Sequence, residues 1–526
     1  MMSKKCKQDG CNNNVYKELT KCILHCEKSN YSVDFNKIGF LENFNDELIK
    51  YIAKELNKYN SSEIGLGYDD FVKYFTNEIK KTSTNDIKKH NIIEAKITSH
   101  TTILNYIIFP NRKSTDSFDY IKVLQKVNGV HFDHCEFQTS FLEIEQTKVF
   151  FQNCIFHDTW TLNNFKIIKS IDNINNVLYQ NCTFKNEISS GAESDKLELE
   201  AIQFKDCKFT EIHFENTVFK KQIFKNGKEF RGSLETLYLY DCVIEDKFIF
   251  NRHKLGDFRL QNTVFKDEFE FKDNADVEVV ITNINFEGFV DFYNTDFKHF
   301  FADKSIFHEF SGFEMCTFGS QDLTEPIKFK HITFLSFISF RDAKFYAGLD
   351  MRDTNLKEYP NFLDAYINPE NTDKETFRII KYSFDKIGNM TEGNKYFSYE
   401  MAKERKKTYF LDNPEKKIIL WFNFIISNFG QSFLLPLFWI FILGIIHHFV
   451  DSWLDNTTIY EIFANYNVNY ENIKIFINSL NDFAKNILPF KRFLPQNKEF
   501  ISLLFLIGYS TLIYHFIVAI KRMIKR

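Results

Sequence analysis

Five phenylalanines stand at an unbroken spacing of five residues in the middle of the chain, at Phe204, Phe209, Phe214, Phe219 and Phe224. An α-helix, with its period of 3.6 residues, would scatter these rings around its axis, and a β-strand would turn alternate rings to opposite faces. The spacing therefore excludes both ordinary elements for this stretch. We expect the five rings to form a ladder in a repeat core rather than to bind a cofactor.

A four-residue motif accompanies the rings: Asn or Asp, then Cys, Thr or Ala, then any residue, then Phe, Ile or Leu. A short unit repeated so often predicts a solenoid, in which each turn buries its apolar face by stacking on the next. The copies are Asn153–Phe156, Asn181–Phe184, Asp206–Phe209, Asn216–Phe219, Asp241–Ile244, Asn262–Phe265, Asn294–Phe297, Asp342–Phe345 and Asp353–Leu356, with looser copies at His134–Phe137, Lys304–Phe307 and Met315–Phe318.

These motifs resemble the pentapeptide repeat family over residues 130–358. The resemblance implies a mainly β fold, a right-handed quadrilateral β-helix, in which the large central residue and the small residue two positions before it both point inward. This chain departs from the family pattern by using Phe where Leu is commoner, and by spacings of six residues. Tracts 160–178, 186–200 and 225–236 lose the register, and we expect them to leave the coil.

The ten cysteines fall into two groups. Residues 1–14 lack the apolar stretch of a secretory signal, so we expect the first 400 residues to stay in the cytosol, where thiols are reduced. Thr or Ala takes the place of Cys in other copies of the motif, which favours core packing for the middle group. The cysteines of that group all occupy the small-residue position: Cys135, Cys154, Cys182, Cys207, Cys242 and Cys316.

The other four cysteines, Cys6, Cys11, Cys22 and Cys26, lie in a polar segment with His25 beside the last of them. A segment this polar cannot form an apolar core, and a bound metal would supply the missing stability. We predict a zinc knuckle over residues 1–29. Either four thiolates, or three thiolates and the imidazole of His25, would complete a closed structural site.

Segments on both sides of the repeat are expected to cover its exposed strand edges. Residues 30–129 are predicted to be a small mixed α/β cap, with helices near 45–60 and 68–81 and a β-rich stretch around 92–110. Residues 359–415 are predicted to be a helical hairpin, with one helix from a capping box at Thr372 to about Ile387 and another from Thr391 to about Tyr409. A basic run at 403–407 is either a solvated face or a contact with anionic lipid.

Residues 416–526 are predicted to be a membrane domain. Two apolar runs, 433–450 and 500–520, are each long enough to cross a bilayer. Residues 416–428, with Trp421, are too short to span and are expected to lie in the interface. Basic residues flank both spans on one side, which predicts a multi-pass protein of the cytoplasmic (inner) membrane with both termini cytoplasmic. The segment 451–499, with a short helix at 473–488, would face outward.

Polar residues inside the spans are functional candidates in a membrane protein, although they also mark helix contacts. Residues 428–432, 434–437 and 514–522 are similar to the two-helix ion channel domains that accompany some pentapeptide repeat proteins. A Thr-x-Gly-Tyr-Gly selectivity filter is absent from the sequence. The candidate pore or membrane-polar residues are His447, His448, Ser510, Thr511, Tyr514 and His515.

Charge is distributed unevenly along the chain. Residues 131–356 hold 37 Asp and Glu against 25 Lys and Arg, a balance of −12, whereas the whole chain carries −4. The first hypothesis is a membrane-anchored scaffold or sensor that presents this acidic rod to a cytosolic protein. The alternative is an oligomeric ion channel regulated by the rod, because two spans cannot enclose a pore alone and a homo-oligomer would be needed.

Two further classes receive less support. Some pentapeptide repeat proteins mimic DNA and bind topoisomerases, and the acidic rod fits that class, but a membrane anchor makes a nucleic-acid enzyme a less suitable partner. We expect no enzyme activity, because the sequence has no phosphate-binding glycine loop, nucleophile elbow or His-Glu-x-x-His helix.

Overall fold

The computed structural model describes residues 4–17, 19–28, 40–58, 66–80, 87–111, 120–140, 148–163, 176–191, 196–323, 325–454, 475 and 499–524. The predicted outer-loop helix at 473–488 and nearly all of the segment 451–499 lie outside these residues. The chain divides into two compact units. The first contains residues 1–347, 353–358 and 363–366, and the second contains residues 348–352, 359–362 and 367–526.

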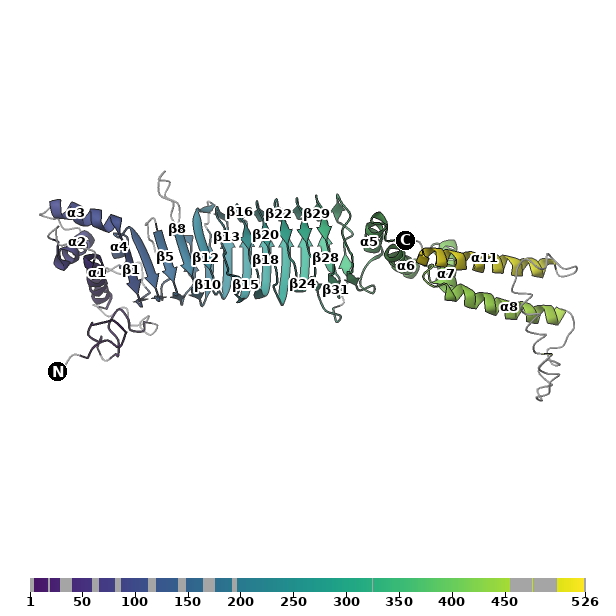
Figure 1. The fold of residues 1–526 in the computed structure, drawn as a ribbon, viewed down its shortest axis with the longest axis horizontal. Helices are drawn as coiled ribbons and strands as arrows, with labels where there is room; N and C mark the ends of the chain where they lie inside the picture. The colour runs from purple at the N-terminus through teal and green to yellow at the C-terminus, as the bar shows by residue number, and fades with distance from the viewer. Residues whose placement is uncertain are drawn as a thin grey trace. The chain divides into compact units, whose positions relative to one another are not determined.

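A β-solenoid of about 10 turns, each of roughly 22 residues, forms the core of the first unit (Figure 1). The predicted β-solenoid is thereby confirmed. Its strands pair in parallel with those of neighbouring turns. The N-terminal turns build two sheets. One contains β1 (Thr101–Asn105), β3 (Gly129–Asp133), β5 (Lys148–Gln152), β8 (Asn176–Gln180) and β12 (Ala201–Lys205), and the other contains β2 (Ile108–Phe109), β4 (Glu136–Phe137), β6 (Ile155–Phe156) and β9 (Thr183–Phe184).

Three further sheets continue the solenoid. The largest contains β7 (Trp160–Thr161), β10 (Glu187–Ser190), β13 (Glu211–Glu215), β15 (Gly232–Tyr240), β18 (His253–Gln261), β21 (Val277–Thr282), β24 (Asp296–Asp303), β27 (Thr317–Phe318), β28 (Ile327–Lys330) and β31 (Lys344–Phe345). The second contains β11 (Leu197–Leu199), β14 (Thr217–Phe219), β16 (Val243–Ile244), β19 (Val264–Phe265), β22 (Asn285–Phe286), β25 (Ile306–Phe307), β29 (Thr333–Phe334) and β33 (Asn355–Leu356). The third contains β17 (Phe248–Ile249), β20 (Phe269–Glu270), β23 (Val290–Asp291), β26 (Ser311–Gly312) and β30 (Ile338–Ser339).

The turn from Phe204 to Phe224 explains the spacing of five residues. Phe204 and Phe224 form a parallel bridge, so the chain returns to the same place after 20 residues, and their ring centroids lie 5.9 Å apart. Phe209, Phe214 and Phe219 are buried between them in sequence. Each step of five therefore delivers one ring to the interior from a different part of the turn.

Aromatic rings stack from turn to turn in the core. Phe109, Phe137, Phe156 and Phe184 stack in order with centroid distances of 5.0, 4.9 and 4.5 Å. Burying these rings removes a large apolar area from water. Each stacked pair contributes about 0.5–1.5 kcal/mol of stability beyond that burial. The core is consequently held together by stacking between turns as well as by strand pairing.

In every copy of the four-residue motif except Asp353–Leu356, the first residue adopts the left-handed backbone conformation. Its φ lies between 45° and 58° in the motif copies that begin at His134, Asn153, Asn181, Asp206, Asn216, Asp241, Asn262, Asn294, Lys304, Met315 and Asp342. Asn and Asp adopt this conformation more readily than most residues other than glycine. The conformation of the corner between two strands therefore explains why the motif favours Asn or Asp at this position.

The small-residue position of the motif faces the core. All six middle cysteines are buried, and each thiol donates to a backbone carbonyl of the preceding turn. For Cys316 this donation, to the carbonyl of Phe292, spans 3.0 Å. Burial raises the pKa of Cys242 to about 12, so this thiol stays protonated and unreactive.

The segment before residue 130 differs from the expected cap in two respects. The described helices are α1 (Phe40–Lys58), α2 (Tyr68–Lys80), α3 (Ile87–Ser99) and α4 (Tyr120–Leu124). Residues 92–99, expected to be β-rich, belong to α3. The parallel ladder begins at β1, 29 residues before the predicted start at 130, because Tyr106–Phe109 is a variant motif copy whose first residue has a φ of 59°.

The tracts expected to leave the coil contribute strands to it. Strand β7 lies in tract 160–178, and β10 and β11 lie in tract 186–200. Ile188 pairs with Trp160 on one side and with Ile212 on the other. These strands keep inward-facing Ile, Trp and Leu side chains without the full motif, and the described parts of the tracts therefore remain in the solenoid.

The second unit is mainly helical. It contains α5 (Lys374–Lys386), α6 (Met390–Lys407), α7 (Pro414–Ser427), α8 (Leu434–Leu454) and α11 (Glu499–Ile524), and also the short strand β32 (Leu349–Asp350). Strand β34 (Tyr366–Ile367) lies at the boundary between the units.

The hairpin of α5 and α6 is pinned by ion pairs. Arg378 and Glu400 lie 2.8 Å apart, and Lys374 and Glu404 lie 2.6 Å apart. Asp373 caps α5, in place of the predicted Thr372, because its carboxylate accepts from the backbone amides of Glu375 and Thr376. In the same way Asn389 caps α6, in place of the predicted Thr391.

The hydroxyls of two threonines on this hairpin form hydrogen bonds to the backbone of residues 349 and 351. Thr372 and Thr376 accept hydrogen bonds from the backbone amides of Leu349 and Met351, at 3.0 and 2.9 Å. These amides belong to β32 and the residue that follows it. The hairpin therefore covers a strand whose backbone donors would otherwise be open.

Candidate metal centre and membrane helices

A compact loop pair near the N-terminus brings four ligand-type side chains together. The backbone amide of Cys6 donates to the carbonyl of Asn13, and that of Val15 donates to the carbonyl of Lys4. These bonds fold the segment that holds Cys6 and Cys11 into a tight hairpin. A helical turn then follows, in which Cys26 donates its amide to the carbonyl of Cys22. This turn places Cys22 and His25 on the same side, facing the hairpin.

The ligand atoms of Cys6, Cys11, Cys22 and His25 all lie within 4.8 Å of one another. Sγ of Cys22 is 3.8 Å from Sγ of Cys11 and 3.3 Å from Nδ1 of His25, and Sγ of Cys6 is 3.7 Å from the same nitrogen. A tetrahedral zinc site has S···S edges of about 3.8 Å and S···N edges of about 3.5 Å, from its usual bond lengths. The cluster therefore has the dimensions of a site that could hold such a metal ion.

The pKa values of the side chains in the cluster are shifted in different directions by burial and by nearby backbone amides. Burial opposes ionisation of Cys6, but backbone amides of Cys22 and Gln8 that point at its sulfur lower the pKa of this thiol overall. Burial raises the pKa of Cys22 to about 12, and burial lowers the pKa of His25 to about 4. A neutral imidazole and a thiol that ionises only beside a cation are the expected partners of a metal ion.

Of the two predicted ligand sets, the geometry brings together the one that contains His25. Cys26 lies outside the cluster, with its Sγ 3.6 Å from the carbonyl oxygen of Ile23. Sequence alone left the choice open, because a helical turn can present either residue 25 or residue 26. The direction of the turn that begins at Cys22 settles which side chain faces the other cysteines.

A buried lysine beside the cluster was missed by the sequence analysis. Lys28 is 1 % exposed and donates to the carbonyls of Leu24 and Cys26, at 3.2 and 3.0 Å. Burial lowers its pKa to about 8. The Leu24 carbonyl also accepts from the amide of Ile108 in β2, at 2.9 Å, so this segment joins the metal cluster to the first turn of the solenoid.

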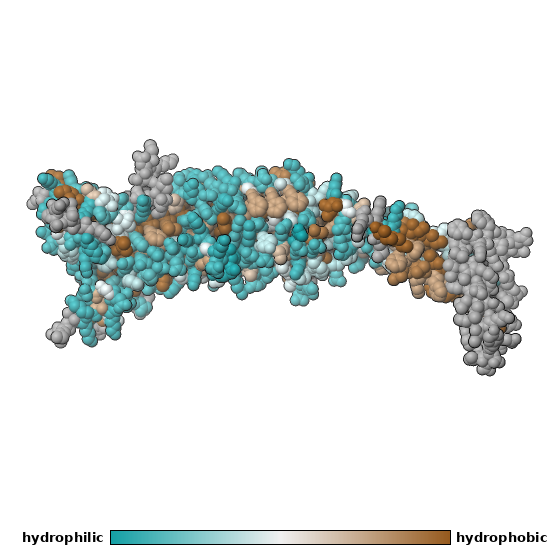
Figure 2. Space-filling model, viewed as in Figure 1, coloured by the Kyte–Doolittle hydropathy of each residue, from teal (hydrophilic) through white to brown (hydrophobic). Residues whose placement is uncertain are grey.

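Two helices of the second unit, α8 and α11, are each long and apolar enough to cross a membrane. Their apolar side chains are largely exposed in the single chain, and Figure 2 shows hydrophobic residues gathered on this part of the second unit. The exposed large residues on these helices are Leu434, Leu437, Phe438, Phe441, Ile446, Leu503, Leu504, Ile507, Tyr514, Ile517 and Ile524.

The polar residues predicted in the spans separate into three groups. His447 lies between the helices, with its ring 4.2 Å from that of Phe505 and its Nδ1 3.4 Å from the hydroxyl of Tyr509. Ser510, Thr511 and Tyr514 lie on the exposed side of α11. His448 and His515 are half-buried, so the structure does not bring the six predicted residues into one cluster.

A network at one end of the helix pair joins α6, α11 and the turn between α7 and α8. Arg522 donates to the carbonyl of Phe429 at 2.5 Å, and its guanidinium lies over the ring of Phe397 at 4.9 Å. The side chain of Asn394 donates to the carbonyl of Arg522 at 3.2 Å, and Gln431 donates to the carbonyl of Asn394 at 2.7 Å.

The turn in this network is tightly constrained. Asn428, Phe429 and Gly430 have φ values of 47°, 56° and 83° in succession. A Cβ on Gly430 would lie 2.6 Å from the guanidinium of Arg522, so any other residue at this positive φ would force the Arg522 side chain to move. The sequence showed the basic end of the second span but gave no signal for these partners.

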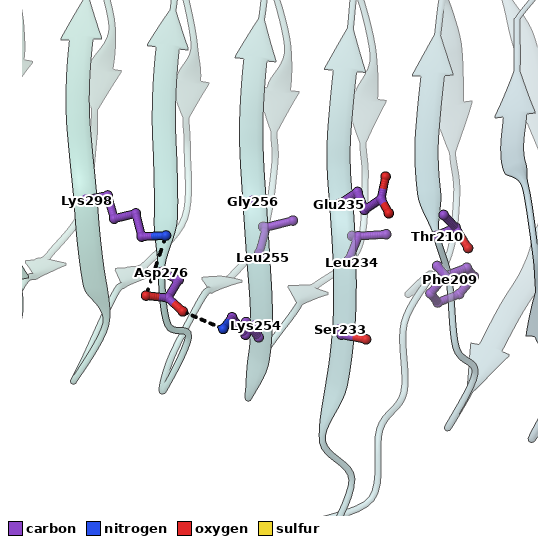
Figure 3. Close-up of a pocket in the computed structure, with 10 residues that line it drawn as sticks. All are labelled: Phe209, Thr210, Ser233, Leu234, Glu235, Lys254, Leu255, Gly256, Asp276 and Lys298. Atoms are coloured by element: carbon purple, nitrogen blue, oxygen red, sulfur yellow. Dashed lines mark ion pairs between the residues drawn. The ribbon is translucent and has the colours of Figure 1, made fainter.

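A shallow pocket of about 400 Å³ lies on the solenoid surface between β13 and β24 (Figure 3). Lys254 and Lys298 approach Asp276 from the two sides, at 2.9 and 3.6 Å. Gly256 allows the close strand contact behind the pocket, because a Cβ there would lie 2.7 Å from the carbonyl of Glu235. Three of the charges that line the pocket, on Lys254, Asp276 and Lys298, thus pair with one another.

Comparisons with protein-family models, with curated proteins and with solved structures find no match for this chain.

Proposed function

We propose that this chain is a membrane-anchored scaffold or sensor that presents an acidic β-helical rod to a cytosolic protein. The proposal includes the finer assignment of the solenoid as a right-handed quadrilateral β-helix of the pentapeptide repeat type. The return of the chain from Phe204 to Phe224 with four inward rings per turn supports four-sided turns. The excess of 12 acidic residues over residues 131–356 supports a charged contact surface.

The observation that carries the proposal is the exposure of the apolar faces of α8 and α11. Phe438, Phe441 and Ile507 are each more than half exposed in the single chain. Apolar surface of this extent on adjacent helices is stable only when lipid or another apolar surface covers it. Both termini would then lie in the cytoplasm, on the same side as the rod.

Flotation of the full chain with vesicles of phosphatidylcholine and phosphatidylglycerol tests the anchor. The chain is expected to float with the vesicles and to stay with them after alkaline carbonate extraction, while added protease degrades the rod. Release by carbonate would contradict the anchor. Replacing Ile507 and Phe441 by Asp should weaken insertion, whereas the same replacement at the exposed Ile387 of the α5–α6 hairpin should not.

We further propose that Cys6, Cys11, Cys22 and His25 hold one structural zinc ion. The support is the tetrahedral spacing of the four ligand atoms and the closed set that they form. The metal would fasten the N-terminal segment on the first turn of the solenoid.

Metal content of the purified chain tests the zinc site with a matched pair of variants. Cys22→Ser should abolish the stoichiometric zinc, because it removes a central ligand, whereas Cys26→Ser should retain it. Equal zinc content in the two variants would contradict the proposed ligand set.

The alternative function, an oligomeric ion channel regulated by the rod, is favoured by a different observation. The network of Asn394, Phe429, Gln431 and Arg522 joins the α5–α6 hairpin to the ends of both apolar helices. Movement of the hairpin would therefore reach the membrane helices directly. Ser510, Thr511 and Tyr514 on the exposed side of α11 would face other copies of the chain.

Recording current across planar bilayers separates this alternative from the scaffold. The full chain is compared with a chain that ends before Ile418. Unitary currents seen only with the full chain would establish a channel. Silence from a chain shown to be inserted would support the scaffold.

A further inference from the structure

Three phenylalanines form a ladder on the outside of the solenoid, where most side chains are polar. Phe289, Phe310 and Phe337 precede β23, β26 and β30, and they occupy equivalent positions in three successive turns. Their ring centroids lie 5.2 and 6.1 Å apart, with the rings stacked at interplanar angles of 17° and 29°. Phe289 is 37 % exposed, and the other two rings are half-buried. Figure 2 shows apolar patches among the hydrophilic residues of the solenoid surface.

The earlier turns show what this position holds when it has no special role. Lys247 and Glu268 stand there and form an ion pair of 2.7 Å. The change from a charged pair to three aromatic rings is confined to the last turns. The outer rings stabilise one another by stacking. The fold does not need them to fill its core, because Phe265, Phe286 and Phe307 already fill the core beneath.

The charge around the ladder is negative and incompletely paired. Glu287 precedes Phe289 by two residues and Glu309 directly precedes Phe310, and both glutamates are exposed. Neither forms an ion pair with any residue that the structure describes. By contrast, the lysines of the preceding turns are engaged: Lys266 with Glu245 at 3.1 Å, and Lys272 with Asp291 at 2.8 Å.

We propose that this outer ladder, Phe289, Phe310 and Phe337 with Glu287 and Glu309, binds a basic segment of a partner protein. The inference rests on the proposed scaffold function and names the surface that such a scaffold uses. Because the rings stack on one another, the ladder presents mainly ring edges, against which the aliphatic stems of Arg or Lys side chains can pack. The carboxylates of Glu287 and Glu309, which form no ion pair with the described residues, add charge complementarity for the cationic ends. An acidic or neutral partner would leave Glu287 and Glu309 unpaired at the interface.

The strand next to the ladder has no space for a side chain at Gly312. Gly312, on β26, has no side chain, and a Cβ there would lie 3.0 Å from the carboxylate of Asp291 and 3.1 Å from the ring of Phe310. The absence of a side chain allows Phe310 to keep its stacked position, because a Cβ at residue 312 would press against the ring. Gly312→Val is therefore expected to displace this ring without removing it.

Peptide binding to the full chain in detergent micelles tests the proposal. The probe is a fluorescent peptide of alternating arginine and glycine, and the comparison peptide has glutamate in place of arginine. Phe310→Ser is expected to weaken binding of the arginine peptide by about tenfold, and Glu309→Gln by about threefold. Phe150→Ser and Glu198→Gln, which alter an outward half-buried ring on β5 and an exposed carboxylate on β11, should leave it unchanged.

The outcomes separate this inference from the proposed function. Equal loss in the ladder variants and the control variants, or equal binding of the two peptides, would overturn the ladder as a site for a basic segment. Vesicle flotation of the same variants reports on the anchor alone and should not change. If light scattering shows that the ladder variants dissociate an oligomer and the arginine peptide does not bind, the occupant is a second copy of the chain and the proposal is wrong.

Discussion

The solenoid and the pair of helices α8 and α11 use the same apolar residues in opposite ways. In the solenoid, Phe258, Phe286 and Phe307 are fully buried by the turns above and below them. In the helix pair, Phe438 and Phe441 are more than half exposed. A solenoid turn obtains its apolar surroundings from its neighbours, whereas the two helices are too few to cover one another. Under the proposed anchor, only the helices depend on an apolar phase outside the chain.

The largest expected effect comes from deleting one ring in each region. Phe286 stacks between Phe265 and Phe307, at 5.2 and 4.7 Å. Phe286→Ala should lower the free energy of unfolding of the solenoid by about 3–5 kcal/mol, because it leaves a cavity. Phe441→Ala should change it by less than about 0.5 kcal/mol. Urea unfolding of the full chain in detergent, followed by circular dichroism of the strands, measures both, and equal losses would remove the contrast between the regions.

A second prediction concerns a buried histidine of the solenoid, which differs from a histidine of the helix pair in its hydrogen bonding. His253 is buried in the solenoid against Phe250, and neither ring nitrogen has a hydrogen-bond partner among the described residues. His447, between α8 and α11, has the hydroxyl of Tyr509 as a partner. The preceding turn makes room for His253 with Gly232, whose Cβ would lie 2.3 Å from the imidazole.

Burial lowers the pKa of His253 to about 4. The folded state therefore binds this proton less readily than the unfolded state, and stability is complete above pH 6.5 and falls as the pH drops from 6.5 towards 4. The expected loss is about 3 kcal/mol over that range. Denaturant midpoints of the wild type and of His253→Asn measure it, and a slope unaltered by the substitution would show that other groups cause the loss.

The smallest of these effects concerns the corners between strands. Asn262 has a φ of 51°, a conformation that costs about 1–2 kcal/mol for most residues. Asn262→Val should destabilise the solenoid by about that amount, and Asn262→Gly should be nearly neutral. Thermal unfolding of the two variants provides the measurement. A valine variant as stable as the glycine variant would mean that the corner relaxes to another conformation.

The repeat was predictable because one physical constraint recurs in every turn. A corner needs Asn or Asp, the interior needs one small and one large residue, and these requirements appear in the sequence as the four-residue motif. The first turn was not predicted, because Tyr106 stands in place of Asn or Asp and Ile107 in place of the small residue. Tyr106 nevertheless has the same left-handed backbone, and Ile107 is fully buried. The motif specifies an environment, and other residues can also meet it.

The cluster of Cys6, Cys11, Cys22 and His25 and the network around Arg522 were predictable only in part. Cysteine spacing indicated a metal site, but the choice of His25 over Cys26 depends on the direction of one helical turn. The partners of Arg522 lie 93 and 128 residues away in sequence, at Phe429 and Asn394. Contacts of this kind depend on how helices pack, and a single sequence carries no local pattern for them.

Quenching of tryptophan fluorescence by brominated lipids tests the central claim most directly. Trp160 is fully buried in the solenoid, and Trp439 lies on α8. Two variants of the full chain, each with one of these as its only tryptophan and Phe at the other positions, are inserted into brominated vesicles. We expect strong quenching of Trp439 and none of Trp160. Equal quenching of the two, or none of Trp439, would contradict an anchor formed by α8 and α11.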